Sequence, residues 1–376
     1  LRESGFRVYA VDRNPDAPGL ALSDGYAPID IIDADGVTDY AREIGAHVIL
    51  AVNEAGVLAA AEASKRLGLV HLSPEAAVRC LDKGLMRDCW KEAGLPQPDY
   101  RVVQTTKEIS TVAAELGYPI ILKPVTHWGS RGVSLVRDES ELSGAIDFAK
   151  KHCRNRPYMV EKFIYGTEMT VEGLVQQGRP QILAKSDKEP QVHPRYRVAM
   201  SINYPARFDP WQLDLADQVV TGAVRALGIE NGAFHGECMI NEKGVYLLEL
   251  GARGGGDYIF SRIVEAVSGI CMPRALVRIL LNERPDIRPR YQRGACWRFF
   301  VPPDGVFREV LNLDEARNLP GILDMGFDMA PGTVAAPIKG DADRPGYVVA
   351  AGTTREEAIA NADRAIARVR FVMGQA

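Results

Sequence analysis

Residues 236–250, which read GECMINEKGVYLLEL, decide the fold of this 376-residue chain. Two apolar stretches flank a short polar turn, a pattern that predicts a β-hairpin. A three-residue loop with a glycine in its left-handed position would pair Asn241 with Val245. Counting outward from that pair places Glu237 directly opposite Glu249 on the two strands.

The opposed glutamates predict a cation site. Directly opposed Cβ atoms lie about 4.5–5.5 Å apart, and like charges at that distance repel each other. Oxygen ligands of this kind suit magnesium or calcium better than a soft metal. The alternative is a solvated edge strand with two unrelated glutamates, but the residues around Glu237 and Glu249 are too apolar for an exposed hairpin.

The hairpin is followed by GARGGG, residues 251–256. Consecutive glycines allow another group to approach the backbone closely. They lead into a helix predicted from Asp257, whose N-terminal amides favour an anion. Arg253 is then placed to bind a phosphate or a carboxylate. A flexible turn with a solvated arginine is the alternative interpretation.

A second cationic group stands at Lys123, the last residue of the apolar strand Pro119–Lys123. A lysine in a buried strand requires an anionic partner. The loop Gly129–Gly132 follows six residues later, and its small residues could wrap a phosphate with backbone amides. Lys123 and this loop together favour a phosphate site, although no GxxxxGK[ST] motif of a Walker A loop occurs. Glu161 and Glu168, taken alone, read as an ordinary solvated pair.

Composition excludes several classes of protein. Hydrophobic residues make up 46% and charged residues 25%, as in ordinary globular proteins. The net charge of −4 gives no general attraction for nucleic acid or anionic membranes, and no basic, aromatic-rich face is visible. There is no apolar run of 18 residues that would span a membrane. The six cysteines form no CxxC pair, which fits a reducing cytosol and neither a disulfide scaffold nor a zinc ribbon.

The chain reads as three domains. Its first 75 residues alternate helical patterns with the apolar runs Arg7–Val11 and His47–Val52, which predicts βαβ units and a parallel sheet. The chain opens at Leu1 without a Met, and we expect its true N-terminus to be missing. A capping-box pattern predicts a last helix at Arg355–Val372. The predicted domains are residues 1–80, residues 81–284 with a lid at about 100–165, and residues 285–376.

These motifs, in this order, resemble the ATP-grasp superfamily. The resemblance implies a fold of mixed α/β and α+β class, with a truncated Rossmann-like N-terminal domain, a lid subdomain and a C-terminal α+β portion. The matching segments are DKGLMR at 82–87 with GLPQP at 94–98, YPIILKP at 118–124 with GSRGV at 129–133, VEKFIYGTE at 160–168, GE at 236–237, and LELGAR at 248–253.

The resemblance also implies how ATP would be bound. Lys83, Lys123 and Ser130 of the small loop would contact its phosphates, and Glu168 would accept hydrogen bonds from its ribose. Backbone groups of a hinge would line its adenine. The hinge residues are Glu161, Lys162, Phe163 and Ile164.

For the metal and the chemistry, the resemblance assigns Glu237 and Glu249 to magnesium, with manganese as a possible substitute, between the β- and γ-phosphates. Arg253 would steady an acyl phosphate and the transition state. One departure concerns the second metal ligand. Members of the superfamily usually carry Asn two residues after the second glutamate, and here Gly251 offers no side-chain ligand.

The implied activity is a carboxylate–amine ligase that activates an acid as its acyl phosphate and then transfers it to an amine. Amino-acid ligases are the first choice within the class, and purine-pathway or carboxylase-type ligases are an alternative. An ATP-binding protein without ligase activity is another. A dinucleotide-dependent dehydrogenase built on residues 1–80 is disfavoured, because no Gly-rich turn precedes Asp12.

The expected partners are a small acid and an amine, with no nucleic acid and no membrane, in the cytoplasm. A homodimer is an expectation from relatives that are often dimers. For substrate residues, His193, Arg195 and Arg197 could close over a carboxylate or belong to a solvated loop. His235 lies two residues before Glu237 and either reaches the site or is a satisfied core histidine.

Overall fold

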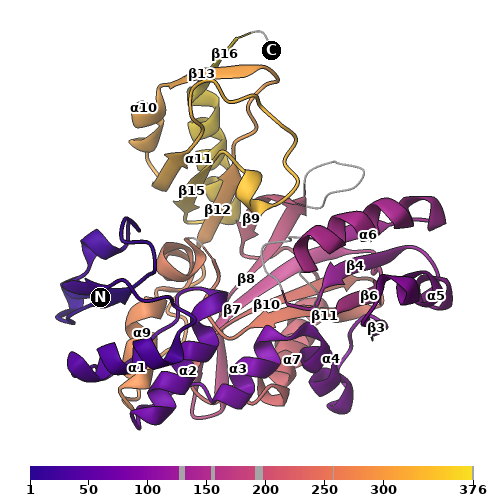
Figure 1. The fold of residues 1–376 in the computed structure, drawn as a ribbon. Coiled ribbons are helices and arrows are strands. Elements are labelled where there is room, and N and C mark those ends of the chain that lie inside the picture. The colour runs from indigo at the N-terminus through magenta and orange to yellow at the C-terminus, as the bar shows by residue number, and fades with distance from the viewer. Residues whose placement is uncertain (127–131, 154–156, 191–197, 257, 375–376) are drawn as a thin grey trace.

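A computed structural model describes residues 1–126, 132–153, 157–190, 198–256 and 258–374. The N-terminal elements lie beside a long central sheet, a lid with its own small sheet covers one end of that sheet, and the C-terminal elements extend from its other end (Figure 1). The fold is mixed helix and strand, in agreement with the class predicted from the sequence.

The N-terminal region is mainly helical. Its two short strands pair in parallel, and Asn53 caps the turn that precedes α2 by accepting a hydrogen bond from the Gly56 N–H. Residues 47–52, predicted as a strand, form no ladder in the described chain, since β1 and β2 pair only with each other. The elements are β1 (Tyr9–Val11), β2 (Gly25–Ala27), α1 (Ala34–Glu43), η3 (Glu54–Gly56), α2 (Val57–Arg66), α3 (Pro74–Leu81) and α4 (Lys83–Glu92).

The lid is an antiparallel sheet in the order β3-β6-β4-β5, with two helices closing its apolar core. A capping box at Thr105 starts its first helix, and Gly117 ends that helix with a φ of 70°. The strands are β3 (Tyr100–Val103), β4 (Ile120–Pro124), β5 (Ser134–Val136) and β6 (Tyr158–Lys162), and the helices are α5 (Thr106–Leu116) and α6 (Glu139–Cys153).

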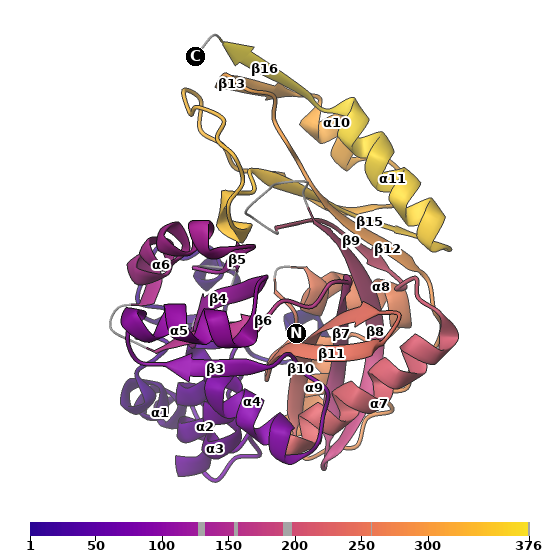
Figure 2. The ribbon, with the colours of Figure 1, turned by 90° about the vertical axis from the view of Figure 1, so that its right-hand side faces the viewer.

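The central sheet is antiparallel throughout, in the order β11-β10-β7-β8-β9-β12-β15-β14. The helix α7 (Pro210–Ala226) packs on β8, β10 and β11, as Figure 2 also shows. The helix α8 (Val264–Ser268) packs on β8 and β12, and α9 (Met272–Leu280) packs on β7 and β10. The π-helix η4 (Ile259–Ile263) packs against α8 and α9. Its strands up to residue 251 are β7 (Thr167–Gln176), β8 (Arg179–Pro190), β9 (Ala199–Tyr204), β10 (Gly232–Asn241) and β11 (Gly244–Gly251).

The C-terminal region continues the same sheet. β9 pairs directly with β12, so strands from both sides of the predicted boundary at residue 285 share one ladder. The domain limits themselves stay predictions. The elements are β12 (Gly294–Phe299), β13 (Val306–Leu311), α10 (Leu313–Arg317), β14 (Ile322–Phe327), β15 (Gly346–Gly352), α11 (Arg355–Arg368) and β16 (Arg370–Gly374).

The last helix is shorter than predicted. Thr354 caps α11 by accepting a hydrogen bond from the Glu357 N–H, in agreement with the capping pattern. The helix ends at Arg368, and residues 370–374 form β16, which pairs with β13. The prediction of helix for residues 369–372 is therefore wrong. Val369 continues the helical spacing of Ile359, Ala362 and Ile366, but this spacing does not fix the residue at which the helix ends.

Candidate active site

A cavity of about 540 Å³ lies between the lid, the central sheet and the C-terminal region. Its volume is within the range of about 300–1,000 Å³ that is usual for small-molecule sites. Every predicted site residue that the structure describes lines this one cavity. These residues are Lys83, Lys123, Glu161, Lys162, Phe163, Ile164, Glu168, Glu237, Glu249 and Arg253.

At the lid end, a buried carboxylate holds two cations. Glu161 on β6 accepts a hydrogen bond from the Lys123 ammonium at 2.7 Å and another from the Arg87 guanidinium at 2.8 Å. Burial alone would raise the pKa of Glu161, but these two cations outweigh burial and lower it. The pKa of Lys123 is lowered, chiefly by burial. Arg87 also donates to the carbonyl of Leu248 at 3.0 Å, which ties α4 to β11.

The predicted hinge, residues 161–164, lines the cavity and is held by contacts to neighbouring segments. The Lys162 ammonium donates to the carbonyl of Gly117 at 2.7 Å, at the end of α5. The backbone N–H of Lys162 donates a hydrogen bond to the carbonyl of Asp99, and that of Phe163 donates one to the carbonyl of Pro119. These two N–H groups are therefore engaged within the protein and are not available to bind a base.

The hairpin does place Glu237 opposite Glu249, but not by the predicted turn. Asn241 pairs with Gly244 and not with Val245, so the loop has two residues and the register near the turn is shifted. An irregularity in the register after Glu237 inserts one extra residue, Leu248, on β11 and restores the opposition. The predicted opposition is confirmed, and the predicted turn is wrong.

Each hairpin carboxylate already contacts a cation. The Lys83 ammonium lies 3.0 Å from Oε1 of Glu249. Lys188 on β8 contacts Glu168 and lies 2.6 Å from Oε1 of Glu237. Burial would lower the pKa of Lys188, but the two carboxylates outweigh it and raise that pKa. Sequence reasoning missed Lys188, because only the pairing of β7 with β8 and β10 brings it to the site.

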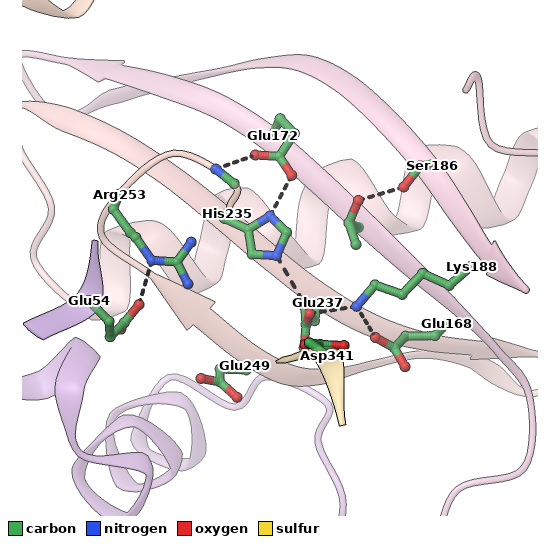
Figure 3. Close-up of polar contacts among 12 residues, drawn as sticks. Glu54, Glu168, Glu172, Ser186, Lys188, His235, Glu237, Glu249, Arg253 and Asp341 are labelled. Atoms are coloured by element: carbon green, nitrogen blue, oxygen red, sulfur yellow. Dashed lines mark hydrogen bonds and ion pairs between the residues drawn. The ribbon is translucent and has the colours of Figure 1, made fainter. Parts of the chain in front are cut away.

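Glu237 has a second cationic neighbour on its own strand, His235, which sequence reasoning left undecided (Figure 3). The ring Nε2 lies 3.5 Å from Oε1 of Glu237, and Nδ1 contacts the fully buried Glu172. Burial would lower the pKa of His235, but the charge of Glu172 outweighs it and raises the pKa to about 9. In turn, Lys188 and His235 outweigh the burial of Glu237 and hold its pKa well below its usual value.

The side chain of Arg253 is held in place by Glu54 of the N-terminal region. Its Nε donates to Glu54 at 2.6 Å and its Nη1 to the carbonyl of Gly254 at 2.8 Å, so two of its five N–H donors are used. A Cβ on Gly251 would lie 3.3 Å from the Glu54 carboxylate, tighter than most such contacts. The glycine at 251 thus leaves room for the Glu54–Arg253 pair, which the sequence did not reveal.

The next glycines make room for protein groups. A Cβ on Gly254 would lie 2.1 Å from the ring of Phe260, and one on Gly255 would lie 2.9 Å from both carboxylate oxygens of Glu172. The predicted close approach to this backbone is therefore made by Phe260 and Glu172. After the loop, the chain forms the π-helix η4 and then α8, whereas residue 257, where a helix was predicted to begin, is outside the described residues.

The C-terminal region also reaches the cavity, a contribution absent from the predictions. Lys339, Asp341 and Arg344 line it. The Arg344 guanidinium lies 3.7 Å from the centroid of the Phe299 ring, and its Nη2 lies 3.5 Å from Asp341. These contacts hold the segment around Asp341 against the sheet, near Glu237 in the view of Figure 3.

The hairpin carboxylates fit a magnesium ion that also binds phosphates. Lys188 and His235 contact the same oxygen of Glu237, Oε1. Because both contacts engage Oε1, a cation would be bound through the second oxygen of Glu237. Magnesium typically binds one or two carboxylates together with substrate phosphates and water. In the described part of the chain no cluster of three or more His, Cys, Asp or Glu side chains has the geometry of a metal site.

Several predicted residues lie outside the described residues. They are Ser130 of the small loop and the candidate substrate residues His193, Arg195 and Arg197. Among the helices that the structure describes, none is both long enough and apolar enough to cross a membrane.

Comparison with known proteins agrees with this architecture. Residues 116–261 match the ATP-grasp domain, and residues 298–374 match the L-amino acid ligase C-terminal domain 2. The chain is similar in structure to the L-amino acid ligase from Bacillus licheniformis, with a TM-score of 0.83, 24% identity, and coverage of 99% of this chain and 94% of that one. This likeness establishes the fold.

Two relatives are similar in sequence. The uncharacterized protein y4rH of Sinorhizobium fredii is 29% identical over 325 residues, which cover 83% of this chain and 67% of y4rH. The alanine–anticapsin ligase of Bacillus subtilis is 27% identical over 303 residues, which cover 73% of this chain and 62% of that ligase. The chain thus spans about two thirds of the length of these relatives.

Proposed function

Residues 116–261 match the ATP-grasp domain, and from this premise we propose that the chain is an ATP-dependent ligase that joins a small carboxylic acid to an amine. The observation that carries the proposal is the single cavity lined by the hinge, the two lysines, the paired glutamates and Arg253. A binding site for a nucleotide alone would not need Arg253 or the C-terminal residues Lys339, Asp341 and Arg344, which also line the cavity.

In the proposed reaction the carboxylate of the acid attacks the γ-phosphorus of ATP, which forms an acyl phosphate and releases ADP. The amine then attacks the acyl carbon, and the C–O bond to phosphate breaks with loss of one proton from nitrogen. The products are an amide and inorganic phosphate. Lys83 and Lys123 would neutralise the phosphates, and the remaining donors of Arg253 would bind the acyl phosphate. No covalent nucleophile from the protein is required.

Glu237 and Glu249 would hold magnesium, and manganese could replace it. When bound, the metal would neutralise the charge on the β- and γ-phosphates. The contribution of the chain is to hold these two carboxylates in place. Lys83 contacts one of them and Lys188 the other, so each is anchored before any ligand arrives.

The nucleotide would enter with its adenine at the hinge and its ribose beside Glu168. The Ile164 backbone and the hinge carbonyls are the groups proposed to recognise the base, and Glu168 the group proposed to accept from the ribose hydroxyls. Ser130 is retained as a proposed phosphate contact. Closure of the lid would exclude water, which protects an acyl phosphate from hydrolysis.

An amino acid is the proposed acid. Support comes from the match of residues 298–374 to a domain of L-amino acid ligases and from the similarity to the alanine–anticapsin ligase. A purine-pathway ligase is the second candidate. It is favoured by the similarity to the formate-dependent phosphoribosylglycinamide formyltransferase of Corynebacterium jeikeium, 30% identical over 177 residues that cover 43% of that enzyme. The proposal also places the protein in the cytoplasm and takes it to be a homodimer.

The test is ADP release with ATP and magnesium against single amino acids, amino-acid pairs, and acids paired with amines, including glycinamide ribonucleotide with formate. We expect release that requires an acid. Glu249→Gln should lower it at least a hundredfold while the circular dichroism spectrum is unchanged, because the metal loses a charged ligand. The matched control is Asp217→Asn, which removes the carboxylate partner of Lys185 outside the cavity.

Each outcome has a distinct meaning. Substrate-dependent ADP release retained by Glu249→Gln would refute the proposed metal site. ATP binding by calorimetry with no release across the panel would favour the alternative of an ATP-binding protein without ligase activity. Release with formate and the ribonucleotide alone would favour the purine-pathway candidate.

A further inference from the structure

Behind the paired glutamates lies a buried contact chain that the reaction above does not use. It begins at Glu172 on β7, whose side chain has no exposed surface, and passes through His235 on β10 to Glu237 (Figure 3). β7 and β10 are neighbouring strands, and Glu172 and His235 are directly paired residues on them. The contact is therefore set by the register of the sheet.

The same carboxylate also holds the loop that carries Arg253. Oε1 of Glu172 contacts Nδ1 of His235, and Oε2 accepts from the backbone N–H of Gly255 at 3.1 Å. A Cβ on Gly255 would lie 2.9 Å from both oxygens, so the loop can approach Glu172 this closely only with glycine there. One buried group thus contacts both the strand of Glu237 and the loop of Arg253.

A merely structural explanation does not account for the position of this carboxylate. An ionised carboxylate buried without partners is costly, and an apolar residue would fill the same space without that cost. His235 compensates its charge from one side and the Gly255 N–H from the other. Both partners are neighbours of groups proposed to bind ATP, its metal or the acyl phosphate.

We propose that Glu172 and His235 are a positioning pair, which fixes the carboxylate of Glu237 relative to the loop of Arg253 so that metal and acyl phosphate are bound at a set separation. The inference rests on the proposed function, since it assigns Glu237 to a metal. His235 would hold Oε1 of Glu237 in place together with Lys188, and Glu172 would set the ring orientation of His235. Such outer contacts usually change metal affinity by ten- to a hundredfold.

Metal affinity can be measured without knowing the acid or the amine. Free Mn²⁺ is titrated by electron paramagnetic resonance into the full chain with ATP present. We expect Glu172→Gln and His235→Ala each to weaken Mn²⁺ binding ten- to a hundredfold, whereas ATP binding without metal changes less than threefold. The double variant should be no weaker than the worse single variant, because the two residues act as a unit.

Two conservative variants separate positioning from folding. His235→Gln can carry its amide to the place of Nε2 and keep the contact with Glu237, whereas His235→Asn can reach the place of Nδ1 and keep only the contact with Glu172. Mn²⁺ affinity should be partly rescued in the first and not in the second, at equal melting temperature. The control Asp217→Asn, also a loss of a carboxylate, should bind Mn²⁺ as the wild type does.

Failure of the positioning pair and failure of the proposed function would give different results. If wild-type protein binds Mn²⁺ with ATP and the Glu172 and His235 variants bind it equally well, the positioning pair is refuted and the proposed function stands. Additive losses in the double variant, or equal affinities of the Gln and Asn variants, would also refute it. If the wild type shows no Mn²⁺ binding that depends on ATP and on Glu237, both the proposed function and this inference are overturned.

Discussion

The substitution Glu161→Gln tests how the lid is joined to the rest of the molecule. The carboxylate lies 2.7 Å from the Lys123 ammonium and 2.8 Å from the Arg87 guanidinium, and the three side chains are at most 8% exposed. Glutamine keeps the shape but removes the only charge that compensates these two cations within the triad. Loss of one member of a buried ionic group typically costs about 3–5 kcal/mol of unfolding free energy.

Urea unfolding followed by tryptophan fluorescence measures this loss. With a slope of about 3 kcal/mol per molar urea, a loss of about 3–5 kcal/mol lowers the midpoint by about 1 M or more. The buried Trp90, whose ring lies 5.5 Å from the Arg87 guanidinium, contributes to the signal. The matched control is Glu75→Gln, because Glu75 pairs with Lys65 where both side chains are more than half exposed. Such a pair contributes at most about 1 kcal/mol.

The stability difference between the wild type and Glu161→Gln should also depend on pH in a defined direction. The pKa of Glu161 is lowered in the folded state, so its contribution is complete above its ordinary value of about 4.5 and is lost as the pH falls through the lowered value. The difference between wild type and Glu161→Gln should thus be constant near neutral pH and shrink in acid. A loss below 1 kcal/mol at pH 7, or a difference that grows in acid, would refute the interpretation of the triad as an ionic clamp.

Two further variants probe the glycine loop and the C-terminal region. Gly255→Ala should lower stability by about 1–3 kcal/mol in thermal unfolding, because its Cβ would lie 2.9 Å from Glu172, whereas Gly256→Ala, with open space at its Cβ, should stay within about 0.5 kcal/mol; equal melting temperatures would contradict this. Asp187→Asn should break a buried bidentate pair with Arg355, at 2.5 and 2.7 Å, and speed hydrogen exchange in α11 more than in α7. Unchanged exchange in α11 would show that this pair does not fasten the helix.

The hairpin shows why a correct prediction can rest on a wrong detail. The sequence pattern predicts two apolar strands and a short turn, and any register that buries both apolar faces keeps the parity of the side chains. The predicted three-residue loop and the observed two-residue loop differ by one position. The irregularity after Glu237 compensates for that position and leaves Glu249 opposite. Irregularities of this kind have no reliable sequence signal. The opposition of the two glutamates could therefore be predicted, but the turn and the register that produce it could not.

Residues that act through distant partners were not predictable. Lys188 lies on β8, a strand that the sequence analysis did not identify, and reaches Glu237 only through the order of the sheet. Glu54 lies 199 positions from Arg253 in the sequence. Glu161 reads from the sequence as a solvated glutamate or a hinge residue, and its role as a buried counterion depends on Arg87 from another element. Local patterns predict elements, but they do not predict which charges meet between elements.

The charges in the cavity show a common arrangement. Each carboxylate proposed to bind metal or ribose contacts a lysine, as Glu249 contacts Lys83 and both Glu168 and Glu237 contact Lys188. A cavity lined by unpaired charges of either sign would carry a large desolvation cost. The pairs avoid that cost and hold both kinds of group close together.

Binding of a metal–nucleotide complex would then be an exchange of partners. Under the proposed function, a phosphate would replace Glu249 as the partner of Lys83, and a divalent cation would replace Lys83 as the partner of Glu249. Each ion loses one partner and gains another of the same sign, so little uncompensated charge is created at any stage. Metal alone or nucleotide alone would break the Lys83–Glu249 pair without replacing both partners. This geometry therefore favours binding of the two together, and ATP affinity in calorimetry should rise with Mg²⁺ in the wild type but not in Glu249→Gln.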